Sequence, residues 1–275
     1  MLSMQRDRSE SYVSAPTPYP ELNAVLAHFL RELERLLAEN FVGAYLQGSF
    51  AVGDFDVHSD VDFVVVTMGE PDDDLPALQR LHANIFDLPS EWAKHLEGSY
   101  FPAETLRRAD TTGSPLWYLD HGSRSLIRSS HCNTLVVRSV LREHGVVVAG
   151  PSPGELVRPV STEALRREIR ATMVSWGRQV LDDPAPYRNK FYQGYLILNY
   201  ARMLHDLREG RPGSKLAGAE WAKAALGGEW HDLIDRAWST RPNPAVSVRT
   251  PPDSKDFERT LSFVKLCIEQ AELPR

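Results

Sequence analysis

Apolar residues in the first quarter of the chain follow a helical pattern and then a strand-like one. Over residues 22–37 they recur at spacings of three and four, which places one apolar stripe along a helix. Residues 41–47 and 61–67 are rich in aliphatic and aromatic side chains, which is typical of buried strands. Residues 48–59 between them are turn-like, so the pattern predicts helix, strand, loop and strand.

The rest of the pattern divides the chain near residue 155. Before that point it predicts helices over 75–83 and 133–143 and short strands over 96–102 and 145–150. After it, helical patterns cover 163–181, 190–208, 215–226, 231–238 and 256–272, separated by segments rich in proline and glycine. We therefore expect an α+β protein: a flexible N-terminal arm over 1–20, a domain with a small mixed sheet and helices over 21–155, and an all-helical bundle over 156–275.

Length and composition are those of a globular protein. The chain has 275 residues, of which 42% are hydrophobic and 25% charged, enough for about two domains. No apolar run approaches the roughly 18 residues of a membrane span, and the first residues lack a secretory pattern, so a cytoplasmic protein is expected. Cys132 and Cys267 are too few for a disulfide scaffold and are expected in the interior.

The charge balance limits the choice of partners. Lys and Arg number 31 against 37 Asp and Glu, a net charge of −6. This acidic balance argues against nucleic acid as a partner and is compatible with a cationic substrate.

The residues that suggest chemistry lie in and after the loop that joins the two strands. Gly48-Ser49 follows the first strand, and the small first residue allows backbone amides and the hydroxyl to approach a phosphate closely. Asp60 and Asp62 stand two apart at the head of the second strand, so both carboxylates leave the same face. Such oxygen ligands suit Mg²⁺, either one ion or two, bridged to substrate phosphates.

Simpler and competing interpretations exist for the same segment. A Gly-Ser turn alone is common, and an Asp-x-Asp pair is often a solvated strand end. Read as a calcium loop from Asp54, the segment has Ser59 where glycine is required and Val65 where glutamate is required. The spacing of Gly43 and Gly48 matches a P-loop, but the Lys-Ser/Thr pair is missing. The combination of the Gly-Ser and Asp-x-Asp elements, in this order, favours a nucleotide site.

At these residues the sequence resembles the nucleotidyltransferase superfamily of DNA polymerase β, and within it the streptomycin/spectinomycin 3''/9-adenylyltransferases. The signature of a Gly-Ser after one strand and an Asp-x-Asp on the next is met by Gly48-Ser49 and Asp60-Val61-Asp62. Residues 97–102 and 147–153 and the helical C-terminal half add to the resemblance, which covers roughly residues 22–272.

The resemblance implies Mg²⁺-dependent transfer of a nucleoside monophosphate, AMP from ATP as co-substrate, to a hydroxyl with release of pyrophosphate. It implies that a third carboxylate on a neighbouring strand acts as metal ligand and general base, and Glu97 is the matching position; Glu91 is a weaker competitor. Arg202 and Lys215 reproduce the spacing of an arginine and a lysine that reach the triphosphate in the family. For each of these two, a solvated helix end is the simpler alternative.

For the acceptor, the resemblance implies a small molecule, with an aminoglycoside as the leading choice and antibiotic resistance as the associated role. Trp176, Asp182 and Asp183 stand roughly where the family holds aminoglycoside amines, although Tyr192 occupies a position where an acid is expected. Two other functions remain open: modification of a protein or tRNA, as in nucleotidyltransferase toxins, and a non-catalytic nucleotide-binding module.

Overall fold

A mixed six-stranded sheet forms the centre of the N-terminal half. The computed structural model describes residues 15–241 and 248–273. The strand order is β5-β4-β3-β2-β1-β6, in which β2 and β3 run parallel and the other neighbours run antiparallel. The strands are β1 (Phe41–Leu46), β2 (Val61–Thr67), β3 (Leu96–Pro102), β4 (Leu116–Leu119), β5 (Leu126–Ser129) and β6 (Val146–Ala149).

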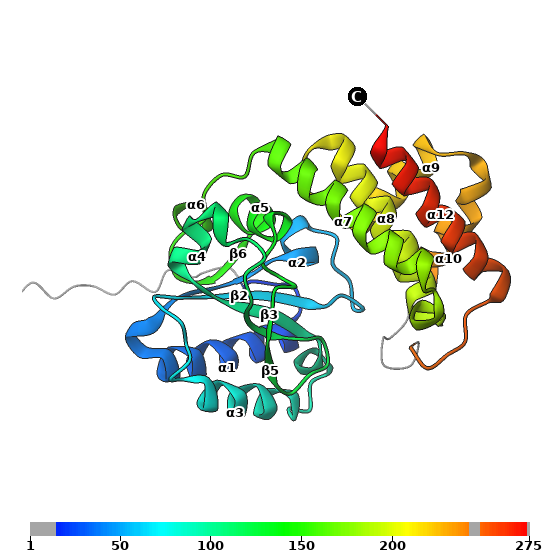
Figure 1. The fold of residues 1–275 in the computed structure, drawn as a ribbon. Helices are drawn as coiled ribbons and strands as arrows, with labels where there is room; N and C mark the ends of the chain where they lie inside the picture. Colours follow the sequence, from blue (N-terminus) through cyan, green and yellow to red (C-terminus); the bar gives the residue numbers. More distant parts are fainter. Residues whose placement is uncertain (1–14, 242–247, 274–275) are drawn as a thin grey trace, which may run out of the picture.

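Helices cover both faces of this sheet (Figure 1). On one face lie α1 (Pro20–Leu37) and α3 (Leu75–Phe86), and on the other lie α4 (Ala103–Arg107), α5 (Leu135–His144) and α6 (Pro153–Leu156). The alternation of a strand explains the two layers, since Phe63 and Val65 belong to the first core while Val64 and Val66 belong to the second.

The C-terminal half is a bundle of helices around a separate hydrophobic core (Figure 1). Polar caps begin four of them, since Ser161, Asn189, Ser214 and Asp253 each accept a backbone N–H three residues on. The helices are α7 (Thr162–Asp182), α8 (Lys190–Glu209), α9 (Lys215–Ala225), α10 (His231–Ser239) and α12 (Ser254–Glu272).

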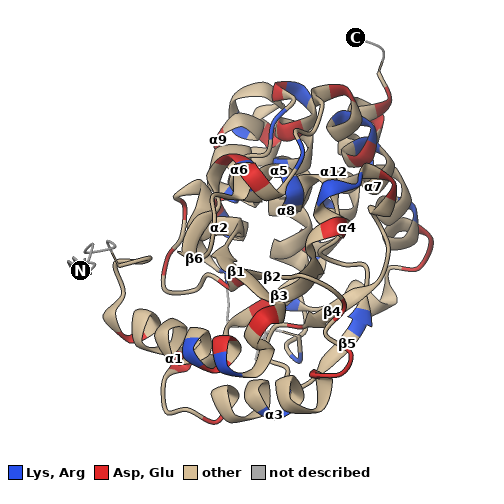
Figure 2. Ribbon diagram, turned by 90° about the vertical axis from the view of Figure 1, so that its left-hand side faces the viewer, with Lys and Arg blue, Asp and Glu red and all other residues tan. Residues whose placement is uncertain are grey.

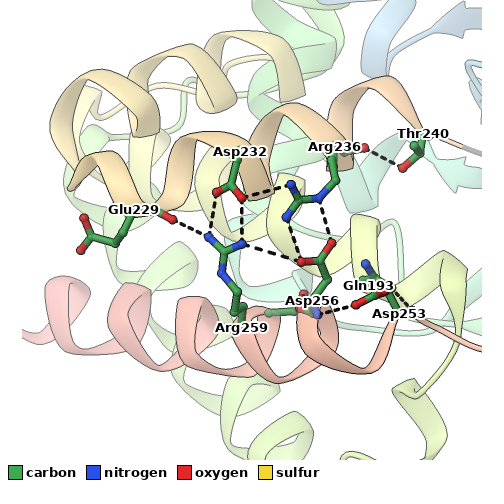
Figure 3. A network of polar contacts seen from close by, with 9 residues as sticks. Gln193, Glu229, Asp232, Arg236, Thr240, Asp253, Asp256 and Arg259 are labelled. Carbon is green, nitrogen blue, oxygen red and sulfur yellow. Dashed lines mark hydrogen bonds and ion pairs between the residues drawn. The ribbon is translucent and has the colours of Figure 1, made fainter.

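An ion-pair network fastens α10 to α12 (Figure 3). The Arg236 guanidinium donates to Asp232 at 3.0 Å and to both oxygens of Asp256 at 2.8 Å, and Arg259 donates to Asp232 at 3.0 and 2.8 Å. Because one carboxylate serves two arginines and one arginine serves two carboxylates, the contacts hold the two helices in one register.

The α+β class with a helical C-terminal region is confirmed, but three local features differ from expectation. The hairpin of β4 and β5 was not predicted, because neither strand has a run of β-branched residues like the one that marks β6. Residues expected in a loop form a short helix, α2 (Gly48–Val52). Thr17 is buried and bonds Asn23, so the end of the expected arm is held in place; residues 1–14 lie outside the described part.

Charged residues of both signs are interspersed along the helices in Figure 2, whereas the central strands are largely uncharged. Within residues 15–241 and 248–273, each helix is too short or too polar to cross a bilayer.

Polar contacts join the two halves of the chain. Both Glu168 oxygens accept backbone amides at the start of α5, and Arg241 pairs with Asp56 in the loop before β2.

Candidate active site

The Gly-Ser element and the Asp-x-Asp element meet at the ends of β1 and β2. The Gln47 backbone amide donates to the Asp62 carbonyl at 2.8 Å, which ties the two segments together. Gly48 has a left-handed φ of 59°, and a Cβ there would lie 2.0 Å from Asp62 Oδ2. Only glycine therefore leaves room for the Asp62 carboxylate at this place and adopts the required backbone without strain.

Asp60 lies beside two histidines that come from other elements. His121, in the turn after β4, has its Nδ1 2.7 Å from Asp60 Oδ1, and the His95 and His121 rings are 5.2 Å apart. Burial opposes ionisation of Asp60, but the hydrogen bond and charge of His121 lower its pKa. The pKa of His121 is in turn raised, because contact with Asp60 outweighs its burial.

Asp62 and Glu97 stand opposite each other in the parallel register of β2 and β3. Burial and the charge of Asp60 raise the pKa of Asp62 to about 6. Burial, followed by the charge of Asp62, raises the pKa of Glu97 to about 8. Two partly buried carboxylates on adjacent strands thus resist joint ionisation, and a cation would favour their charged forms.

Tyr118 on β4 holds Glu97 from the other side. Its hydroxyl lies 2.6 Å from Glu97 Oε1 and 2.9 Å from Asp120 Oδ1, and a single hydroxyl proton can serve one of them at a time. Burial, then the charge of Glu97, raises the pKa of Tyr118 well above its usual value, so the phenol stays protonated. His131 Nε2 is 3.7 Å from the same Glu97 oxygen.

Two basic residues of the helical half face these carboxylates. Gly218 of α9 packs against the Arg202 backbone of α8 so closely that a Cβ would lie 2.4 Å from Arg202 Cα. This contact brings Lys215 near Arg202, and burial followed by that neighbouring charge lowers the pKa of Lys215. Lys215 acts in turn on the charges of Asp60 and Asp62, and its Nζ lies 5.4 Å from the centre of the Tyr195 ring.

Several features of the site fit a divalent cation and a phosphate. The acids resist joint ionisation, as expected for groups that a cation would neutralise. Within the described residues, Ser49 Oγ is buried and has no hydrogen-bond partner, so it is free to donate to a phosphate oxygen beside Gly48. Asp60, Asp62 and Glu97 do not, however, form a set whose ligand atoms all lie within 4.8 Å; Asp60, His95 and His121 do.

The three residues expected to bind the acceptor do not lie together in the structure. Trp176 on α7 packs edge-on against Tyr195, with ring centres 6.0 Å apart. The charges of Glu97 and Asp60 add to burial in raising the pKa of Tyr195. Asp182 and Asp183 are exposed at the C-terminal end of α7, where Asp183 accepts the Ala185 amide at 3.3 Å. The side of the site nearest the carboxylates is thus aromatic.

Four residues contact or adjoin the site carboxylates in a way that was not expected from the sequence. Tyr118 and Asp120 adjoin Glu97, and His95 and His121 adjoin Asp60. Three of them belong to β4 and the turn after it, and this strand was not predicted. His95 was detectable only by its position two residues before Glu97.

Two family models match the chain. The nucleotidyltransferase domain matches residues 27–97, which include Gly48, Ser49 and the three carboxylates. The C-terminal domain of aminoglycoside adenylyltransferases matches residues 155–262, which include Arg202 and Lys215. No curated protein sequence matches the chain.

One solved structure is similar over nearly the whole length. It is the spectinomycin adenyltransferase AAD(9) from Enterococcus faecialis, crystallised with ATP and spectinomycin. The TM-score is 0.69 at 14% identity, and the match covers 90% of this chain and 98% of that one. At that identity the similarity establishes a common fold.

Proposed function

We propose that this chain, a nucleotidyltransferase related to the aminoglycoside adenylyltransferases, transfers AMP from Mg²⁺-ATP to a hydroxyl of an aminoglycoside-type acceptor. The observation that carries the proposal is the set of three carboxylates, Asp60, Asp62 and Glu97, at the starts of two parallel strands. The positive charges of Arg202 and Lys215 in the other half act on Asp62 and lower its pKa against the effect of burial.

In this proposal Asp60 and Asp62 hold Mg²⁺ and Glu97 completes the set. When bound, the cation neutralises charge that builds up on the phosphates during transfer. Hard oxygen ligands on neighbouring strand starts are the donors that Mg²⁺ prefers. Side-chain rotation would have to bring the three carboxylates together around one ion. Taking one oxygen from each of Asp60, Asp62 and Glu97, the three atoms do not all lie within 4.8 Å of one another.

The triphosphate is bound from two sides. The Gly48 backbone and the Ser49 hydroxyl contact phosphate oxygens from the sheet side, where the orphaned Ser49 Oγ supports this role. Lys215 and Arg202 contact the triphosphate from the helical side and stabilise the pyrophosphate as it leaves. Their mutual repulsion, which contributes to the lowered pKa of Lys215, is relieved by an anion between them.

Glu97 accepts the proton of the acceptor hydroxyl. The acceptor oxygen forms a bond to the α-phosphorus, the bond from the α-phosphorus to the bridging oxygen breaks, and pyrophosphate departs. Burial and the charge of Asp62 raise the pKa of Glu97 to about 8 while no cation is bound, and a bound cation would hold Glu97 in the ionised form that can accept the proton. Tyr118 orients the carboxylate through the 2.6 Å contact with Oε1.

The acceptor is proposed to lie between Glu97 and the aromatic residues of α7 and α8. Trp176 and Tyr195 provide flat surfaces for a sugar ring, while the three site carboxylates attract amines. Asp182 and Asp183 contribute charge from the end of α7. Such exposed charges are screened over about 8 Å at physiological ionic strength, so acceptor binding should weaken as salt rises.

The test measures pyrophosphate release from Mg²⁺-ATP with spectinomycin, streptomycin and a wider aminoglycoside panel. Release with at least one of them, together with a mass increase of one AMP on that acceptor, is the expected result. The Asp62→Asn variant is the blank. Release with none, alongside thermal stabilisation by Mg²⁺-ATP, would exclude the antibiotic acceptor and leave nucleotide transfer to be tested on proteins and tRNA.

A further inference from the structure

A second cluster of metal-binding side chains lies at the edge of the site. Asp60, His95 and His121 come from the start of β2, the segment before β3 and the turn after β4, and their ligand atoms all lie within 4.8 Å of one another. Nucleotide transfer with Mg²⁺ requires oxygen ligands and leaves both imidazoles without a role. The arrangement of two nitrogens and one oxygen therefore needs a separate explanation.

The ligand atoms are already close to the arrangement that a tetrahedral ion requires. In a zinc site the ligands lie about 2.0–2.2 Å from the metal and so about 3.4 Å from each other. Asp60 Oδ1 and His121 Nδ1 are 2.7 Å apart and no pair exceeds 4.8 Å. Small movements of the three side chains are needed to place the ligand atoms at equal distances around one ion.

One histidine of the cluster has a ring nitrogen without a partner. Within the described residues, His95 Nδ1 is buried and makes no hydrogen bond, which is uncommon for a polar atom inside a protein. Asp60 and His121 retain 37% and 21% side-chain exposure, so an ion can reach the cluster from solvent. An unpartnered imidazole nitrogen beside an accessible carboxylate is what a metal ligand set needs before it is filled.

We propose that Asp60, His95 and His121 form a site for a borderline-soft divalent cation of the Zn²⁺ class, and that its occupation inhibits the enzyme by withdrawing Asp60 from Mg²⁺. Imidazole nitrogen favours Zn²⁺ and its neighbours over Mg²⁺, which prefers oxygen alone. The ion replaces the proton shared by His121 Nδ1 and Asp60 Oδ1, and that proton passes to solvent. Metal binding stands by itself, whereas the inhibition rests on the proposed function.

The first test is a titration of the untagged protein with Co²⁺, without nucleotide, followed by visible absorption, and then displacement with Zn²⁺. One Co²⁺ per chain should give the absorption of a nitrogen-ligated ion, and His121→Gln or His95→Gln should each weaken binding by more than about 10-fold. His58→Gln, an exposed histidine in the loop before β2, is the matched control and should bind as the parent does.

Circular dichroism and thermal unfolding establish that each variant is folded. If His95→Gln does not fold, His121→Gln decides, because that side chain is partly exposed. Unchanged Co²⁺ affinity in the folded His121→Gln variant would overturn the site. Loss of binding in Asp62→Asn with retention in both histidine variants would overturn it as well, since the ion would then occupy the carboxylates.

The second test addresses inhibition. With an acceptor that supports pyrophosphate release, Zn²⁺ should inhibit in competition with Mg²⁺, and His121→Gln should raise the half-inhibitory Zn²⁺ concentration by more than about 10-fold. Zn²⁺ binding without competition against Mg²⁺ would refute the shared role of Asp60. If no acceptor is found, the proposed function fails while the Co²⁺ titration still decides the site.

Discussion

The Asp62 carboxylate fills the space that a side chain at position 48 would need: a Cβ on Gly48 would lie 2.0 Å from Asp62 Oδ2. The glycine therefore does more than turn the chain after β1. In the proposed function it sets how close the backbone proposed to bind phosphate can come to the carboxylate proposed to bind Mg²⁺.

A first prediction concerns that glycine. We expect Gly48→Ala to reduce transfer to the level of the Asp62→Asn blank, because the new methyl displaces Asp62. It should also lower the free energy of unfolding by about 1–3 kcal/mol through the left-handed backbone. Gly53→Ala is the matched control, since Gly53 also has a positive φ, of 87°, but open space around it. Loss of stability in both variants with loss of activity in Gly48→Ala alone is the expected pattern, and equal activities would refute it.

A second prediction separates the stability and the activity of Asp62. Its carboxylate has a pKa raised to about 6, so above that pH its charge costs stability when no cation is bound. At pH 8 without divalent metal, Asp62→Asn should therefore unfold at a higher temperature than the parent, yet transfer nothing. Mg²⁺-ATP should raise the unfolding temperature of the parent much more than that of the variant. The exposed Asp73→Asn serves as control and should match the parent in both assays.

A third prediction concerns Glu97 and its partner. If Glu97 takes the acceptor proton, Glu97→Gln should lower kcat by roughly 10²–10⁴ while Mg²⁺-ATP binding changes little. Tyr118→Phe removes the 2.6 Å contact and keeps the carboxylate, so a smaller fall in kcat with an altered pH profile is expected. Loss of nucleotide binding in Glu97→Gln, as severe as in Asp60→Asn, would make Glu97 a metal ligand only.

A fourth prediction tests the helical side of the site. Lys215→Met removes the charge that faces Asp60 and Asp62, and it should weaken Mg²⁺-ATP binding, measured by calorimetry, more than acceptor binding. Lys223→Met is the control: Lys223 lies on the same helix but pairs with Asp235 of α10, so the ATP affinity of this variant should not change. Equal ATP affinities in the two variants would place the triphosphate elsewhere.

A fifth prediction concerns stability against pH. His82 is buried among Phe29, Phe63 and Tyr100, and burial lowers its pKa to about 3. In the unfolded chain His82 takes up a proton near pH 6.5, whereas in the folded protein it stays neutral down to about pH 3. The free energy of unfolding is therefore unaffected by this group above pH 6.5 and decreases as the pH falls from 6.5 toward 3. From pH 7 to pH 5 this group should remove about 2 kcal/mol from the free energy of unfolding. In denaturant titrations at both pH values, the fall in the free energy of unfolding from pH 7 to pH 5 should be larger for the parent than for His82→Gln by that amount. An equal fall in the two proteins would refute the prediction.

The sequence by itself determined the class of the fold and the nucleotidyltransferase motif. A stripe of apolar residues in α1, a β-branched run in β2 and glycine- and proline-rich breaks between the later helices are local signals, and each was sufficient to place its element within a few residues. Gly48, Ser49, Asp60 and Asp62 were found for the same reason, because their meaning depends on order and spacing along the chain.

The tertiary structure alone decided how the expected residues meet and which further side chains join them. Glu97, which was expected only from the resemblance, stands opposite Asp62 in the parallel register of β2 and β3. Tyr118 and His121 lie on or just after β4, a strand that was not predicted. Lys215 faces the carboxylates because Gly218 lets α9 approach α8. These contacts join residues far apart in the sequence, and they depend on how strands pair and how closely helices pack.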